Sequence, residues 1–246
     1  MALRAQATII PLAPQVVSTP RLYEPSVKEI HIKALHNGKE IAFQVEWEDE
    51  TKDTRVDVNH FTDAVALEFP SSGAQARPHF AMGDKDNFVN IWHWKAVWQE
   101  KNEEVKIYAT VDHFLGGVLA DNPISIKKTP IENIVANSYG TVTSMRKNES
   151  HIRGLGKHSG KTWTVVFKRA LRGDNDYEAS FPEGGLVPLA LAAWDGHNGE
   201  RGGRKSVSTW YYVGLATEEK KTVYIYPVLA FFGALIAEAA IILRIR

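Results

Sequence analysis

Hydrophobic and polar residues alternate along most of this chain, which is the pattern of β-strands that bury one face. The clearest example is residues 29–49, where two alternating runs flank Asn37-Gly38, the dipeptide preferred in a tight type I′ hairpin. Similar runs predict strands at residues 63–69, 87–98, 103–111, 162–171, 186–194 and 205–215. The expected fold class is therefore mainly β, an antiparallel β-sandwich that occupies residues 25–216.

Two stretches lack a sustained alternation. Residues 1–24 contain Pro11, Pro14 and Pro20, and we expect them to form an extended N-terminal arm. Residues 115–160 are irregular, so we expect an elaborate connection within the sandwich, with room for one short helix. No repeat divides the chain into further units.

The last hydrophobic segment differs from the rest because it is continuous. Residues 222–243 contain one charged residue, Glu238, and a helix of this length spans about 30 Å, the thickness of a bilayer core. We therefore predict a single C-terminal transmembrane helix in contact with membrane lipid, the alternative being a hydrophobic helix docked on the sandwich. Glu238 either contacts a partner helix, exchanges protons, or reaches the nearby interface.

Composition excludes several classes of function. Lys and Arg total 29, as do Asp and Glu, so nothing indicates a nucleic-acid partner. The chain has no cysteine, which excludes disulfides, thiolate metal sites, cysteine-ligated iron–sulfur clusters and covalent attachment of c-type haem. Hydrolase signatures and a phosphate-binding loop are also missing from the sequence.

Candidate chemistry is concentrated in two blocks. Residues 79–96, "HFAMGDKDNFVNIWHWKA", place Met82 in a turn before a strand that carries Trp92, His93 and Trp94. On these residues alone, Met82 either lines a cofactor site or fills a gap beside aromatic rings in the core. The second block, residues 191–212, contains Trp194 and, at a loop–strand junction, Lys205, where a lysine is ordinarily exposed to solvent.

Four blocks in sequence order carry a resemblance to a known family: residues 61–70, 78–96, 162–171 and 191–215. Together they resemble the haem b subunit of ethylbenzene dehydrogenase and the related γ subunits of type II molybdoenzymes of the dimethyl-sulfoxide-reductase family. That group includes the γ subunits of dimethylsulfide dehydrogenase and of selenate and chlorate reductases, and, more distantly, a subunit of nitrite oxidoreductase.

The resemblance implies one non-covalent haem b with a methionine and a lysine as axial ligands. Matching the "MGD" turn gives Met82, and matching the "KSVSTW" strand gives Lys205; Lys168 is the competing lysine, and His79 or His93 is an alternative ligand. The residues expected to surround the cofactor are Trp92, His93, Trp94, Trp194 and Ser206.

The function implied by the resemblance is electron transfer without catalysis. Such a subunit relays electrons between the iron–sulfur and molybdenum catalytic subunits of a respiratory complex and quinone or cytochrome c, with its haem domain on the extracytoplasmic (periplasmic) face. A rival hypothesis is a membrane-tethered β-sandwich that binds carbohydrate or protein on a platform of Trp92, Trp94, Trp194 and Trp210. A scaffold subunit with the same fold and no haem is the third possibility.

Overall fold

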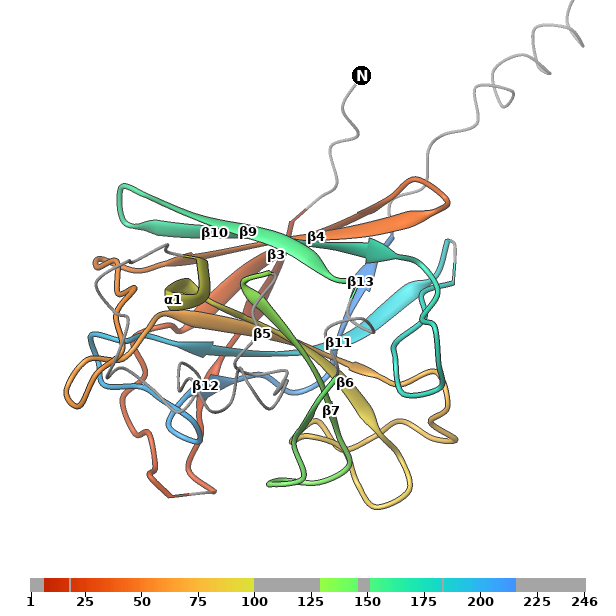
Figure 1. The fold of residues 1–246 in the computed structure, drawn as a ribbon, viewed down its shortest axis with the longest axis horizontal. Coiled ribbons are helices and arrows are strands. Elements are labelled where there is room, and N and C mark those ends of the chain that lie inside the picture. The colour runs from red at the N-terminus through yellow and green to blue at the C-terminus, as the bar shows by residue number, and fades with distance from the viewer. Residues whose placement is uncertain (1–6, 18, 100–128, 146–150, 183, 216–246) are drawn as a thin grey trace, which may run out of the picture. The chain divides into compact units, whose positions relative to one another are not determined.

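Two antiparallel β-sheets make up most of the part of the chain that this computed structural model describes, residues 7–17, 19–99, 129–145, 151–182 and 184–215. Residue contacts divide the chain into two units, and all the described strands belong to the unit formed by residues 2–216. In Figure 1 the strands β3, β4, β9 and β10 form one layer, and β5, β6 and β11 form the other. The β-sandwich expected from the sequence is therefore confirmed.

The first sheet has five strands in the order β1–β3–β4–β10–β9, and all its neighbours are antiparallel. Its strands are β1 (Thr8–Pro11), β3 (Glu29–His36), β4 (Glu40–Glu48), β9 (Arg153–Ser159) and β10 (Thr162–Ala170).

The second sheet has eight strands. Seven follow the order β2–β12–β11–β5–β6–β7–β8, and β13 also pairs with β11. The strands are β2 (Ala13–Pro14), β5 (Ala64–Pro70), β6 (Val89–Lys95), β7 (Ile131–Ala136), β8 (Thr143–Ser144), β11 (Leu186–Trp194), β12 (Ser206–Val207) and β13 (Tyr211–Gly214).

An aromatic core fills the space between the sheets. Phe43 from β4 meets Trp92 from β6 edge-on, with ring centroids 5.9 Å apart, and Trp163 from β10 meets Trp94 in the same way at 5.0 Å. All four side chains are almost completely buried. Burying a large apolar side chain contributes about 1.5–3 kcal/mol, so these contacts across the layers hold the two sheets together.

The predicted hairpin at residues 29–49 is confirmed as β3 and β4, but the predicted type I′ turn between them is wrong. A type I′ turn needs positive φ at both central residues. Gly38 has φ 80°, whereas Asn37 is not among the described non-glycine residues with positive φ. The Asn37 side chain instead accepts hydrogen bonds from the backbone N–H groups of Lys39 and Glu40, an Asx-type turn that competes with the tighter one.

Within residues 115–160, where the sequence predicted an irregular connection, Ile131–Ala136, Thr143–Ser144 and Arg153–Ser159 form the strands β7, β8 and β9. β7 is buried along its whole length and so shows no alternation. In β9, Gly154 and Gly156 resemble loop residues, yet a Cβ on Gly156 would lie 2.2 Å from an atom of the Trp94 indole. These glycines therefore let core side chains approach the strand backbone closely.

Three other predicted segments differ from the observed elements. The run at 87–98 ends as a single helical turn, α1 (Ala96–Gln99), and the run at 205–215 is divided between β12 and β13. Within the predicted N-terminal arm, β1 pairs with β3 and β2 pairs with β12. This segment therefore adds one strand to each sheet.

The predicted strand at 103–111 and the predicted membrane span at 222–243 lie outside the described residues. Within the described ranges, no helix combines the length and the apolar character needed to cross a membrane.

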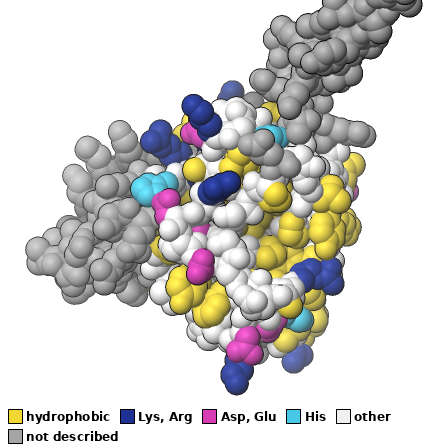
Figure 2. Space-filling view, turned by 90° about the vertical axis from the view of Figure 1, so that its right-hand side faces the viewer, with side chains coloured by type: hydrophobic (Ala, Val, Ile, Leu, Met, Phe, Trp, Pro, Cys, Tyr) yellow, Lys and Arg dark blue, Asp and Glu magenta, His cyan; other side chains and the backbone are white. Residues whose placement is uncertain are grey.

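Hydrophobic side chains reach the surface in several places. Figure 2 shows them gathered mainly on the right-hand side of the face drawn there, with charged side chains around them. Large hydrophobic residues exposed in the described part of the chain include Leu155, Leu186 and Tyr212. Apolar atoms make up a large part of the surface of any folded protein.

Candidate functional site

The eight-stranded sheet buries side chains on both of its faces. Residues of β5, β6 and β11 that point away from the other sheet form a second hydrophobic cluster, separate from the core between the sheets. We call this side the outer face. Its centre is made of small side chains, because Ala66 pairs with Ala192 on one side and with His93 on the other. The centre of the outer face is therefore a floor of alanines, which is small in volume compared with the ring systems and long side chains around it.

Met82 packs against the outer face from a strained turn. Its φ of 71° makes it the one non-glycine residue with positive φ in the described ranges, and this conformation is costly for a side chain of its size. The turn is closed by a hydrogen bond from Gly83 N–H to the His79 carbonyl at 2.8 Å. The Met82 N–H lies near the Glu68 carboxyl group of β5 and lowers the pKa of that group.

Lys205 reaches the same face from the residue before β12. The pairing of Ser206 with Ala193 puts Lys205 beside Trp194, and its Nζ lies 5.0 Å from the indole centroid. Burial lowers the pKa of the Lys205 ammonium, and the nearby Glu68 carboxylate opposes this shift. A desolvated lysine with a lowered pKa is more readily present as the neutral amine, the only form that binds a metal.

Glu68 lies near both candidate ligands, because both influence its pKa. It is 8% exposed, and burial raises its pKa to about 8, with Lys205 and the Met82 N–H acting in the opposite direction. Its Oε1 is buried without a hydrogen-bond partner. At neutral pH the carboxyl is therefore mostly protonated, which weakens the counter-charge that would keep Lys205 as an ammonium.

His93 supplies a third candidate donor on the outer face. Its imidazole stacks on the Trp194 indole with ring centroids 4.7 Å apart, and its Nε2 is buried without a hydrogen-bond partner. Burial is the main cause that lowers the pKa of His93 well below its ordinary value, and the charges of Lys95 and Lys205 add to it. The imidazole is consequently neutral at physiological pH, as metal ligation requires.

The other residues predicted for the site lie elsewhere. Trp92 and Trp94 are completely buried in the core between the sheets, on the opposite face of β6 from His93. Ser206 pairs with Ala193, so it faces that core as well, and its buried Oγ has no partner. The sequence predicted cofactor contact for these three residues, whereas the outer face brings together Met82, Glu68, His93, Trp194 and Lys205.

The alternative ligands His79 and Lys168 are also separated from this group. His79 is exposed, and its ring stacks on Phe80. Lys168 lies on β10 in the other sheet and forms an ion pair with Glu40 at 2.7 Å. Neither is desolvated as Lys205 is.

The rival hypothesis of an aromatic binding platform does not fit the burial of its residues. Trp92 and Trp94 are 0% exposed and Trp194 is 7% exposed. Trp210 packs partly buried on the outer face, where its Nε1 donates to the Pro78 carbonyl at 2.7 Å. These four indoles therefore do not form an exposed surface for a ligand, and the interpretation of them as a platform is wrong.

Sequence reasoning missed Glu68, although a signal was present. In a strand with one solvated face, the residues that alternate with the core would be polar. On the same face as Glu68, β5 instead carries Ala64 and Ala66. An acidic residue in a strand that is apolar on both faces indicates a buried carboxyl group, and buried carboxyl groups are often found at functional sites.

Comparison with known proteins identifies the family. A family model described as ethylbenzene dehydrogenase matches residues 4–206, a range that contains both Met82 and Lys205. The chain belongs to the ethylbenzene dehydrogenase family. This membership and the relatives below confirm the predicted resemblance to the haem-containing γ subunits.

Three relatives illustrate the range of this family. The chain is 26% identical to a putative respiratory nitrate reductase heme subunit of Haloferax mediterranei, over 84% of this chain and 63% of the relative. It is 29% identical to the chlorate reductase subunit gamma of Ideonella dechloratans, over 74% of this chain and 63% of the relative. It is 23% identical to the dimethylsulfide dehydrogenase subunit gamma of Rhodovulum sulfidophilum, over 78% and 62%. The matched region thus spans less than two thirds of each relative.

Among solved structures, a family 9 carbohydrate-binding module from Caldicellulosiruptor kristjanssonii, in complex with glucose, aligns with 86% of this chain and 88% of its own. The TM-score is 0.41 and the sequence identity is 6%.

Proposed function

We propose that this chain binds one haem b on the outer face of the eight-stranded sheet, with Met82 and Lys205 as axial ligands, and transfers electrons. One observation carries the proposal: Met82 packs against the outer-face cluster that contains Trp194, and Lys205 Nζ lies 5.0 Å from the centroid of the same indole. Two residues that are 123 positions apart in the sequence therefore reach one face of the sheet. The relatives include a haem subunit and two γ subunits of oxidoreductases, which supports the same role.

The residues on the outer face fit a haem. A macrocycle needs space among larger side chains, and the small Ala66 and Ala192 of β5 and β11 would provide it. Iron needs donor atoms that other groups do not occupy, and Met82 offers a thioether while His93 offers a buried Nε2 without a partner. Trp194 supplies an aromatic wall beside the two nitrogen donors.

When bound, haem supplies reversible one-electron chemistry at its iron. The thioether of Met82 is a soft donor that favours the ferrous state and so raises the reduction potential. Lys205 donates its amine only when neutral, and burial among Trp194 and the outer-face residues favours that state. With two protein ligands the iron would have no open coordination position for a substrate, so we expect the chain to transfer electrons without catalysis of its own.

We further propose that the chain works as a subunit of a molybdenum-containing respiratory complex. In this role it exchanges electrons with an iron–sulfur partner subunit and with quinone or cytochrome c. The predicted span at residues 222–243 would anchor it to the membrane, with the haem domain on the extracytoplasmic face. Support comes from the names of the relatives, which are subunits of oxidoreductases, and from the hydrophobic C-terminal sequence.

The decisive experiment is spectroscopy of the full chain purified from its host. We expect a dithionite-reduced spectrum of the b type and a pyridine haemochrome assay that gives one extractable haem per chain. A purified chain without haem, or with haem that resists extraction, would contradict the proposal. Mass spectrometry of the intact complex then identifies the subunits that purify with it.

A further inference from the structure

Three buried aspartates meet at one end of the sandwich, away from the alanine floor. Asp49 follows β4, Asp63 precedes β5 and Asp195 follows β11, so the group joins one strand of the five-stranded sheet to two of the other. One carboxylate oxygen from each lies within 4.8 Å of the others. The three residues are 6%, 0% and 7% exposed.

Surrounding N–H and O–H groups hold these carboxylates in place. Asp49 Oδ1 accepts hydrogen bonds from the N–H and the hydroxyl of Thr51 at 3.0 and 3.1 Å. Asp195 Oδ1 accepts two hydrogen bonds, from the His197 N–H at 2.8 Å and from the Asn198 N–H at 3.3 Å. Asp63 accepts three, which come from Gly196 N–H, Asp53 N–H and the Trp163 indole. Donors of this kind favour ionised carboxylates.

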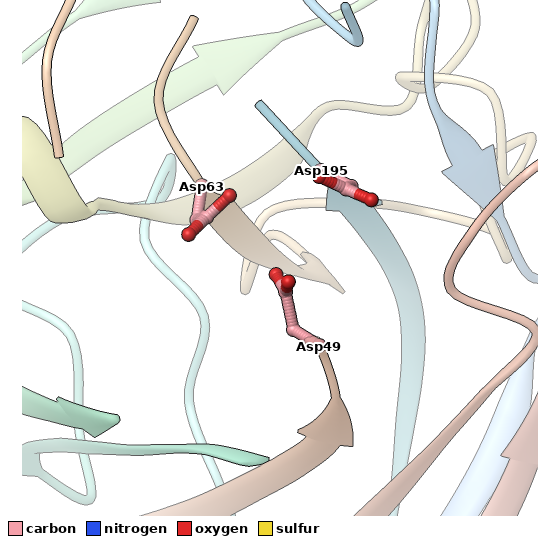
Figure 3. A group of neighbouring side chains, drawn as sticks. All are labelled: Asp49, Asp63 and Asp195. Atoms are coloured by element: carbon pink, nitrogen blue, oxygen red, sulfur yellow. The ribbon is translucent and has the colours of Figure 1, made fainter. Parts of the chain in front are cut away.

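Within the described ranges no ion pair balances the negative charge of the group, although His158 lies close enough to Asp49 to lower the pKa of its carboxyl group. None of the ion pairs formed among the described residues involves Asp49, Asp63 or Asp195. Asp49 Oδ2 is buried and has no hydrogen-bond partner. Figure 3 shows the Asp49 carboxylate directed from the end of its strand toward Asp63 and Asp195. A buried oxygen that is aimed at two further carboxylates requires a cation or a proton.

We propose that Asp49, Asp63 and Asp195 bind a Ca²⁺ ion that ties β4 to β5 and β11. Carboxylate oxygens are the preferred ligands of hard divalent cations, and Ca²⁺ tolerates irregular geometry. Ligands on opposite sides of Ca²⁺ lie roughly 4.6–5.2 Å apart, so oxygens within 4.8 Å of one another can share one ion. Mg²⁺ requires shorter and more regular contacts.

The position of the group suggests what the ion does. Asp63 directly precedes Ala64 and Asp195 directly follows Trp194, and both neighbours belong to the outer face. A cation held by these aspartates fixes the ends of β5 and β11 relative to β4 and stabilises the sandwich. The proposal is independent of haem, because none of its residues contacts Met82 or Lys205 through an interaction identified above.

The test is direct binding of Ca²⁺ to the full chain after treatment with EDTA and dialysis. We expect isothermal titration calorimetry to give one site per chain and Ca²⁺ to raise the melting temperature. In Asp49→Asn and Asp195→Asn the affinity should fall by about 100-fold or more, whereas Asp176→Asn, which changes an exposed aspartate, should leave it unchanged. Melting in EDTA serves as the folding control, because each variant should melt there at or above the temperature of the unsubstituted chain.

Three results would overturn the proposal. One is the absence of Ca²⁺ binding by the unsubstituted chain at about 10 mM, which exceeds the dissociation constants of weak extracellular calcium sites. Another is unchanged affinity in both Asp49→Asn and Asp195→Asn. The third is binding of Mg²⁺ without binding of Ca²⁺, which would exclude the calcium assignment.

Discussion

The indole of Trp194 stacks on the imidazole of His93, with ring centroids 4.7 Å apart and an interplanar angle of 26°. Lys205 Nζ lies 5.0 Å from the centroid of the same indole, whose Nε1 donates to the Gly202 carbonyl at 3.0 Å. One anchored ring thus contacts both nitrogen donors of the outer face. Because His93 and Lys205 contact the same ring, each must be replaced on its own to show which of them is a ligand.

Replacing Met82 with alanine should remove haem or convert its spectrum. Loss of the thioether leaves the iron without one axial ligand, and we expect haem affinity to fall by more than the roughly 10–100-fold caused by loss of an outer-shell partner. Met145→Ala is the matched control, since Met145 accepts a hydrogen bond from Asn133 and is not part of the outer-face cluster. Equal haem content and identical spectra in the two variants would rule out Met82 as a ligand.

Replacing Lys205 with alanine should abolish the low-spin, six-coordinate spectrum, because the second ligand is lost. Lys168→Ala removes a lysine that pairs with Glu40 on the other sheet, and it should leave the spectrum unchanged. Electron paramagnetic resonance of the oxidised protein distinguishes the ligand sets. If His93→Ala changes the spectrum and Lys205→Ala does not, His93 is the axial ligand instead.

Enlarging the alanine floor should exclude the cofactor. Ala66→Leu adds bulk at the centre of the outer face, where Ala66 is 4% exposed, so we expect severalfold less haem per chain. Overpacking itself costs about 1–3 kcal/mol, and circular dichroism will show whether the fold survives. Ala42→Leu adds the same bulk to β4, in the other sheet, and should retain haem. Full occupancy in folded Ala66→Leu would place the cofactor elsewhere.

Trp92→Ala should reduce stability and spare the haem spectrum of the folded fraction. The side chain is completely buried and touches Phe43, Phe69 and Phe181, so its loss should lower the free energy of unfolding by about 3–5 kcal/mol. Guanidinium denaturation followed by tryptophan fluorescence measures the change. A changed haem spectrum at unchanged stability would contradict this assignment to the core.

The pKa of Asp63 makes stability depend on pH when divalent cations are removed. Burial, with a contribution from Asp49, raises this pKa to about 8 from an ordinary value of 3.8. Between about pH 4 and pH 8 the folded chain therefore retains a proton that the unfolded chain has released. The free energy of unfolding consequently falls as pH rises through this window, by at most about 1.4 kcal/mol per pH unit from this group.

Urea unfolding in EDTA at pH 5, 6 and 7 measures that slope. Asp63→Asn has no ionisable carboxyl group at this position. Its free energy of unfolding should therefore fall less steeply with pH than that of the unsubstituted chain, even if the variant is less stable at every pH. Asp176→Asn controls for the loss of an exposed carboxyl group. Parallel slopes in the unsubstituted chain and Asp63→Asn would show that Asp63 has an ordinary pKa.

The alternation of hydrophobic and polar residues by itself determined much of the fold of this protein. It located β3, β4, β5, β10 and β11 to within a residue or two, and in β3, β4 and β10 buried residues do alternate with more exposed ones. It failed at β7, which is buried along its whole length, and at β9, whose glycines admit the Trp94 indole. The two failures have different causes: β7 has no solvated face to produce an alternation, whereas β9 has exposed residues but contains glycines that are typical of loops.

The candidate site was likewise predicted in part from the sequence and decided in part by the tertiary structure. The resemblance to the family singled out Met82 and Lys205, through the "MGD" turn and the "KSVSTW" strand, whereas the residues by themselves left both assignments open. Only the tertiary structure decided which face of β6 each aromatic residue occupies, that the buried Glu68 lies near both candidate ligands, and that three distant aspartates converge. Desolvation and the meeting of charges depend on contacts between residues far apart in the chain, which a linear pattern does not contain.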